Sequence, residues 1–165
     1  MNMQFITVAD NSQIHRLARL AKEIWEEYYP SIITREQIAY MINVFQSPEA
    51  IENQIQEGMR YYLLTQEGKD IGYIGFLEET DGSLFLSKIY LARNFRNKGN
   101  GWKAFKFITD EARKTRCKKI WLTVNKNNKT AIDKYFKMGF AITESVTKDI
   151  GNGFYMDDYV MEYIL

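Results

Sequence analysis

The chain is poor in the residues that hold small or metal-dependent proteins together. It contains one cysteine, one histidine and two prolines in 165 residues. A single cysteine, Cys117, cannot form a disulfide within the chain, and one cysteine with one histidine does not supply the usual ligand set of a zinc site. These shortages argue against a disulfide scaffold and give no reason to expect a metal centre.

The chain also lacks a strong charge of either sign and any long apolar run. Its formal net charge is +1, whereas nucleic-acid binders commonly carry a marked basic excess. No apolar segment approaches the ~20 residues that a membrane-spanning helix needs, and no signal-peptide core is visible at the start. We therefore expect a cytoplasmic protein with neither a nucleic-acid partner nor a membrane partner.

What the chain does contain is typical of one folded domain. Hydrophobic residues make up 45% and aromatic residues 15% of the sequence, enough to build a sizeable core. No internal repeat, low-complexity stretch or evident linker interrupts the chain, and we expect a single domain over residues 1–165.

Periodicity and capping residues predict the order strand, three helices, three antiparallel strands, helix, strand, helix and a final hairpin. This order does not alternate as doubly wound proteins do, so we expect an α+β fold with a mixed sheet and helices on both of its faces. The expected strands are 3–8, 60–66, 71–79, 83–92, 119–124, 140–148 and 154–163, with residues 67–70 as a hairpin loop. The expected helices follow caps at residues 10–12, 34 and 47, and then span 99–116 and 128–138.

The segment that leads from an apolar strand into a helix is the most informative part of the sequence. It places the cations Arg96 and Lys98 beside Gly99 and Gly101. Glycines let a backbone approach a ligand closely, and a helix N-terminus directs unpaired N–H groups and a positive dipole end at the same point. This combination predicts a pyrophosphate-binding cradle.

Residues 99–104 also satisfy the dinucleotide fingerprint G-x-G-x-x-G/A. In that motif the glycines follow the strand immediately, and an acidic residue at the end of the next strand binds ribose. Here the glycines lie well after the strand, and the next strand ends Leu122-Thr123-Val124-Asn125 without an acid. The sequence therefore disfavours a binding site for a nicotinamide dinucleotide.

Two motifs together resemble the GCN5-related N-acetyltransferase superfamily. Its cofactor signature, [Arg/Gln]-x-x-Gly-x-[Gly/Ala], is met by residues 96–101. A second element of that superfamily, Asn-x-x-Ala-x-x-x-Tyr-x-x-x-Gly-Phe, is met at every stated position. The matching residues are Asn128, Ala131, Tyr135, Gly139 and Phe140. The runs 85–90, 151–154 and 156–161 further resemble PaiA-type bacterial polyamine acetyltransferases.

The resemblance implies a largely antiparallel sheet of about seven strands, splayed where acetyl-CoA binds, and acetyl transfer to a primary amine such as a polyamine. It implies that Tyr135 is the general acid for the departing thiolate, since a phenol with a pKa of ~10 stays protonated at neutral pH. It implies that the following residues bind the cofactor: Ile89, Tyr90, Leu91, Arg96, Asn97, Lys98, Gly99, Asn100, Gly101, Trp102, Asn128 and Tyr135.

The general base and the acceptor are less well defined. Some relatives place a glutamate five residues before the motif asparagine, where this chain has Thr123. Glu78 or Glu79, acting through water, is our candidate base. The candidate acceptor-site residues are Glu26, Glu27, Tyr28, Asp157 and Asp158. A protein N-terminus, an amino sugar or a drug amine remains an alternative acceptor, a non-catalytic CoA-binding sensor remains an alternative function, and many relatives form homodimers.

Overall fold

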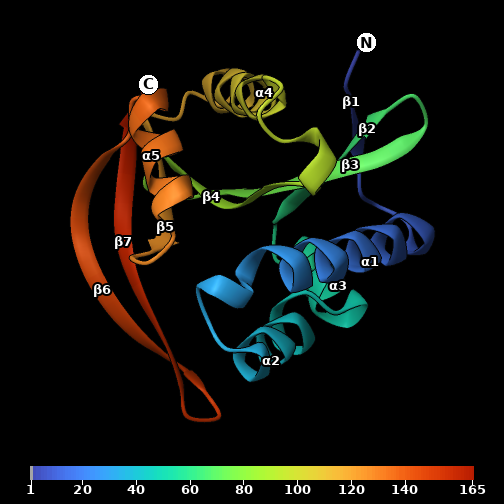
Figure 1. Ribbon diagram of the computed structural model, residues 1–165. Helices are drawn as coiled ribbons and strands as arrows, with labels where there is room; N and C mark the ends of the chain where they lie inside the picture. The colour runs from blue at the N-terminus through green and yellow to red at the C-terminus, as the bar shows by residue number, and fades with distance from the viewer. Residues whose placement is uncertain (1) are drawn as a thin grey trace. The chain divides into compact units, whose positions relative to one another are not determined.

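The computed structural model describes residues 2–165, in which seven strands form one mixed sheet and five α-helices are present (Figure 1). The strands follow the order β1-β2-β3-β4-β5-β7-β6. No helix among residues 2–165 is long and apolar enough to cross a membrane. The strands are β1 (Gln4–Thr7), β2 (Arg60–Gln66), β3 (Lys69–Glu78), β4 (Ser83–Leu91), β5 (Lys119–Asn125), β6 (Ala141–Gly151) and β7 (Phe154–Ile164). The α-helices are α1 (Asn11–Tyr28), α2 (Arg35–Phe45), α3 (Pro48–Gln56), α4 (Asn100–Lys114) and α5 (Lys129–Met138), and two short 3₁₀ helices are η1 (Tyr29–Ser31) and η2 (Arg93–Phe95).

The chain divides into two compact units, Met1–Leu77 with Lys88–Lys106, and Glu78–Ser87 with Phe107–Leu165. We call them the first and second units. Strand β4 and helix α4 each contribute residues to both.

In the first unit, α1, α2 and α3 contact one another, and β1, β2 and β3 pair in antiparallel register. Helix α1 begins where the sequence predicts, because Asp10 and Gln13 form a complete capping box. Its apolar stripe buries Leu17 and Trp25 among other residues. The caps Thr34 and Ser47 start α2 and α3 in the same way, by accepting hydrogen bonds from backbone N–H groups of the first turn.

The connection between β2 and β3 is tighter than the sequence suggested. The expected four-residue loop is a two-residue turn, with Glu67 at φ 51° and Gly68 at φ 76°. Two successive residues with positive φ are typical of the type I′ turn, whose twist matches that of the flanking antiparallel strands. Lys69 and Asp70, expected in the loop, therefore belong to β3.

In the second unit, β5 pairs antiparallel with β7, and β7 pairs antiparallel with β6. Strand β4 joins this unit by parallel pairing of Ser83–Phe85 with Lys119–Trp121. The long β6–β7 hairpin is visible in Figure 1. Strand β6 extends through residues 149–151, which the sequence pattern left outside a strand. The turn between β6 and β7 consists of Asn152 and Gly153 alone, both with positive φ.

Candidate functional site

The segment from Arg93 to Trp102, which we call the cradle, lies entirely in the first unit. Asn97 and Gly99 have φ values of 60° and 83°, so the backbone reverses sharply just before α4 begins at Asn100. The side chain of Asn100 is buried and donates from Nδ2 to the carbonyl oxygen of Phe95, 3.0 Å away, which holds the loop against the helix start. The first backbone N–H groups of α4 have no partner within the helix and therefore suit an anion.

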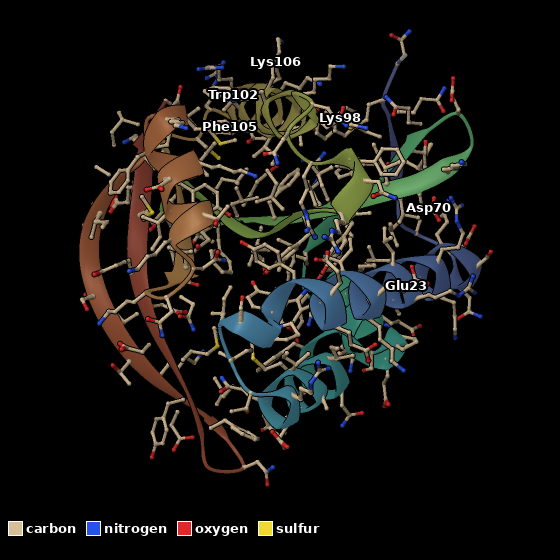
Figure 2. The ribbon with its side chains drawn as sticks, in the orientation of Figure 1. Glu23, Asp70, Lys98, Trp102, Phe105 and Lys106 are labelled. Carbon is tan, nitrogen blue, oxygen red and sulfur yellow. The ribbon has the colours of Figure 1, made fainter. Side chains whose placement is uncertain are left out.

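The space around Gly99 is open. A Cβ atom built at this position would meet no heavy atom within 4 Å. Positive φ, rather than crowding by the protein, is therefore what favours glycine here. Lys98, just before α4, and Trp102, in its first turn, are labelled in Figure 2, and Trp102 is 54% exposed. The cradle is thus an accessible loop of backbone N–H groups with an exposed indole at its rim.

Arg96, the first residue of the cofactor motif, is already engaged by the protein. Its Nη2 lies 2.7 Å from Oε1 of Glu27, and its Nη1 lies 3.3 Å from Oε2. Its Nε donates to the carbonyl oxygen of Leu91 at 2.9 Å, and the guanidinium lies 5.0 Å from the ring centre of Tyr28. Arg96 therefore ties the cradle to the C-terminal end of α1 and to the end of β4. The expected cofactor residue Arg96 and the expected acceptor residue Glu27 form one ion pair.

The end of β4 is fixed by aromatic packing. The hydroxyl groups of Tyr90 and Tyr29 lie 2.7 Å apart, and the ring of Tyr90 lies 5.6 Å from Trp25 and 5.4 Å from Tyr73. Gly72 lies so close to this strand that a Cβ atom there would come within 2.3 Å of the carbonyl oxygen of Tyr90. The side chain of Tyr90 is thus held by its aromatic neighbours, and its carbonyl oxygen lies against Gly72 of β3.

A basic hollow adjoins the cradle in the first unit. It has a volume of about 310 Å³. Its lining residues are Gln66, Glu67, Lys69, Phe95, Lys98, Asn100 and Lys103. Three lysines and one glutamate make its lining electropositive, which suits a phosphate-bearing ligand.

In the second unit, the structure gives the second motif a mainly structural explanation. Asn128 is buried and caps α5, its Oδ1 accepting from the N–H of Ala131 at 3.4 Å. Gly139 ends the same helix at φ 107°, a left-handed conformation typical of a C-cap. Phe140 is buried, and its ring meets the ring of Tyr135 edge-on at 5.6 Å. Tyr135 itself is half-buried on α5.

The two candidate bases lie at the end of β3. Oε1 of Glu79 accepts a hydrogen bond of 2.7 Å from Nε1 of Trp121, whose ring stacks on Phe85 at 4.3 Å. Glu78 is half-buried beside it in sequence. Thr123 is exposed on β5 opposite Val160, with no acidic group at its own position.

The other candidate acceptor residues differ sharply in their surroundings. Glu26 is exposed, 4.0 Å from Lys22 on the same helix. Asp157 is exposed and pairs with Lys126, whose Nζ lies 2.8 Å from its Oδ1. Hydrogen bonds from Lys126 and Thr147 lower the pKa of Asp157. Asp158 is 4% exposed, and burial raises its pKa to about 6.

Sequence reasoning did not single out Lys88. This residue is half-buried on β4, and burial lowers the pKa of its ammonium group to about 8. The sequence could have indicated it, because Lys88 lies on the same strand face as Leu84, Leu86 and Tyr90, which is otherwise apolar. Near pH 8 a substantial fraction of Lys88 is therefore neutral.

Comparison with known protein families identifies this α+β architecture as that of an acetyltransferase. The acetyltransferase (GNAT) family matches residues 15–140, most of the chain. The protein belongs to this family.

Solved structures agree in fold across the whole chain. PaiA N-acetyltransferase from Thermoplasma acidophilum, in complex with coenzyme A, has a TM-score of 0.83 at 20% identity, covering 100% of both chains. A GNAT acetyltransferase from Staphylococcus aureus Mu50 has a TM-score of 0.74 at 18% identity, covering 99% of both chains. A spermidine N-acetyltransferase SpeG chimera from Vibrio cholerae and hSSAT has a TM-score of 0.73 at 17% identity, covering 99% of this chain and 96% of the other. No curated protein matches the sequence.

Proposed function

We propose that this protein transfers an acetyl group from acetyl-CoA to a primary amine, and that the amine is a polyamine such as spermidine or spermine. The observation that carries the proposal is the cradle, an accessible helix N-terminus preceded by a left-handed glycine and bordered by a basic hollow. These features fit a pyrophosphate and further phosphate groups. Among structures similar in fold, one contains coenzyme A, one contains acetyl-CoA, and one is a spermidine acetyltransferase.

In this proposal the cofactor supplies an activated acetyl thioester, and the chain supplies binding and proton handling. Backbone N–H groups from Asn97 to Trp102 hold the pyrophosphate, and Lys98 adds a cation at the rim. The backbone of Ile89–Leu91 pairs with the amide-rich arm, and Asn128 adds a hydrogen bond to it. Both assignments extend the family motifs to this chain.

Tyr135 holds the proton that the departing sulfur requires. A free phenol has a pKa of ~10 and a free thiol one of ~8.5, so a protonated phenol can supply a proton to a thiolate at neutral pH. Glu78 or Glu79 would remove the amine proton through a water molecule, and Oε1 of Glu79 also accepts a hydrogen bond from Trp121.

The direct test is a thiol-release assay with acetyl-CoA and a panel of amines: spermidine, spermine, an amino sugar and a peptide with a free N-terminus. We expect acetyl-CoA to raise the melting temperature and polyamines to release thiol fastest. Thermal protection without thiol release from any amine would instead support a CoA-binding sensor. The absence of thermal protection would contradict cofactor binding itself.

Tyr135→Phe separates the acid role from a packing role, because it removes one hydroxyl group and almost no volume. General acid catalysis typically contributes about 10²–10⁴-fold, so kcat should fall by that factor. Tyr155→Phe, at an exposed tyrosine, is the matched control. A Tyr135→Phe enzyme that turns over within about threefold of wild type would leave water or the substrate as the proton donor.

A further inference from the structure

Two consecutive aspartates of β7 face opposite sides of the sheet. Side chains alternate along a strand, so Asp157 and Asp158 cannot share one environment. Asp157 has protein partners: Lys126 Nζ at 2.8 Å and Thr147 Oγ1 at 3.1 Å. Its charge is compensated on the side where Lys126 also lies 5.5 Å from the ring centre of Tyr159.

Asp158 is recessed but lacks such compensation. It is 4% exposed, and its side chain forms no hydrogen bond or ion pair with residues 2–165. Among residues 2–165, no side-chain oxygen or nitrogen atom is both fully buried and without a hydrogen-bond partner. The carboxylate oxygens of Asp158 therefore reach solvent through a small opening. An ionised carboxylate that is buried to this extent without a partner is costly, and such groups cluster at functional sites.

The strand register describes what surrounds this carboxylate. Asp158 lies opposite Asn125 on β5 and opposite Val146 on β6. Directly opposed residues in antiparallel strands point to the same face, with Cβ atoms about 4.5–5.5 Å apart. Along β7 its neighbours on that face are Met156 and Val160. The buried carboxylate thus has apolar side chains and one amide as its direct neighbours, and the exposed Glu144 and Lys148 lie on the same face one pair further along β6 in either direction.

Burial and the nearby Asp157 both raise the pKa of Asp158, and Lys126 partly opposes them, so that its value is about 6. At neutral pH the carboxylate is nevertheless mostly ionised. A cationic ligand would add to the partial compensation that Lys126 provides.

We propose that Asp158 receives an ammonium group of the acceptor amine, with Val146, Met156 and Val160 packing against the adjoining methylene groups. This inference rests on the proposed function, and it narrows the acceptor to an alkylamine with a positive charge on an apolar chain. It makes Asp158, rather than its neighbour Asp157, the residue that selects the acceptor.

The test compares KM for spermidine, or for the panel amine that is turned over fastest, with KM for acetyl-CoA in four variants. Asp158→Asn removes the charge at constant size, and Asp157→Asn is the matched control on the opposite face. Val146→Lys places a tethered ammonium group opposite Asp158, and Val146→Gln is its uncharged control. The Val146 pair keeps Asp158 intact, so it tests the proposal even if Asp158→Asn does not fold.

We expect Asp158→Asn and Val146→Lys each to raise KM for the amine at least about tenfold, as loss of one charge-assisted contact predicts. KM for acetyl-CoA should stay unchanged in both. The amine KM should rise less in Val146→Gln than in Val146→Lys, and less in Asp157→Asn than in Asp158→Asn. An unchanged amine KM in Val146→Lys, or an equal rise in both KM values, overturns the assignment of Asp158. Wild-type protein that acetylates no amine instead overturns the proposed function.

Discussion

The ion pair between Arg96 and Glu27 leads to a prediction whose sign separates two roles for the motif arginine. If Arg96 positions the cradle, breaking the pair by Glu27→Gln should weaken binding of coenzyme A. If Arg96 binds phosphate directly, the same change releases a cation and should leave the affinity unchanged or increase it. The structure favours positioning, because three of its contacts, to Glu27, Leu91 and Tyr28, lie within the protein.

The magnitude follows from the exposure of the pair. The side chains of Arg96 and Glu27 are 18% and 36% exposed, with one contact of 2.7 Å and a second of 3.3 Å. Hydrogen bonds to charged groups contribute about 1.5–3 kcal/mol when buried, and exposed pairs contribute about 0–1 kcal/mol. We expect a partly exposed, two-point pair to contribute about 1 kcal/mol, or roughly a fivefold weaker affinity for coenzyme A when it is broken.

Calorimetric titration with coenzyme A on Glu27→Gln, Arg96→Met and the double variant measures this coupling as a double-mutant cycle. Glu26→Gln is the control, because Glu26 is exposed and its ion pair with Lys22 is long, at 4.0 Å. The positioning role predicts that Glu27→Gln and Arg96→Met weaken binding to a similar extent and that the double variant is little worse. Tighter binding by Glu27→Gln, with a large loss in Arg96→Met, would refute it.

Three further predictions concern the cradle, the core and Asp158. Gly99→Asp and Gly99→Ala share the strain of a side chain at φ 83°, so we expect their melting temperatures without ligand to be similar. Only Gly99→Asp adds negative charge at the cradle, and we expect only this variant to lose thermal protection by coenzyme A. Equal protection of both variants by coenzyme A would argue against the cradle as the phosphate site. Tyr73→Phe removes the fully buried hydroxyl that accepts from Trp25 Nε1 at 2.8 Å and donates to Gln46 at 2.9 Å, and we expect it to cost about 1–3 kcal/mol and to lower the melting temperature by about 2–4 °C per kcal/mol. A melting temperature equal to wild type would show that these two partners find other hydrogen bonds. The pKa of Asp158 is about 6 in the folded protein and 3.8 ordinarily. Ionisation of this carboxylate therefore destabilises the fold as pH rises from 3.8 to 6. Asp158→Asn should be about 1–3 kcal/mol more stable than wild type at pH 8 and equally stable at pH 3. The charged groups to control for are Asp157 and Lys126 beside it and Glu144 and Lys148 on β6, and a stability difference that persists at pH 3 would mean that charge is not its cause.

Local patterns in the sequence were sufficient for much of the fold. The capping residues Asp10, Thr34 and Ser47 and the C-cap Gly139 mark helix ends through interactions within a few residues of themselves. The predicted phosphate cradle depends on the same kind of local information, since a glycine, a reversal of the backbone and a helix start are neighbours along the chain. The family motifs could therefore be located from sequence, and the matched family confirms their class.

Partners that are distant along the chain could not be predicted in this way. Arg96 and Glu27 are 69 residues apart, and Trp121 and Glu79 are 42 apart. Each pair meets only because helix packing or strand pairing brings its members together. Adjacent carboxylates show the same limit. Alternation predicts that Asp157 and Asp158 face opposite ways, but which one is buried depends on the register of β5 and β6 around β7. The sequence thus determined which residues could bind phosphate or an amine, and the tertiary structure decided which of their charges are already paired, because pairing and burial depend on neighbours that only folding supplies.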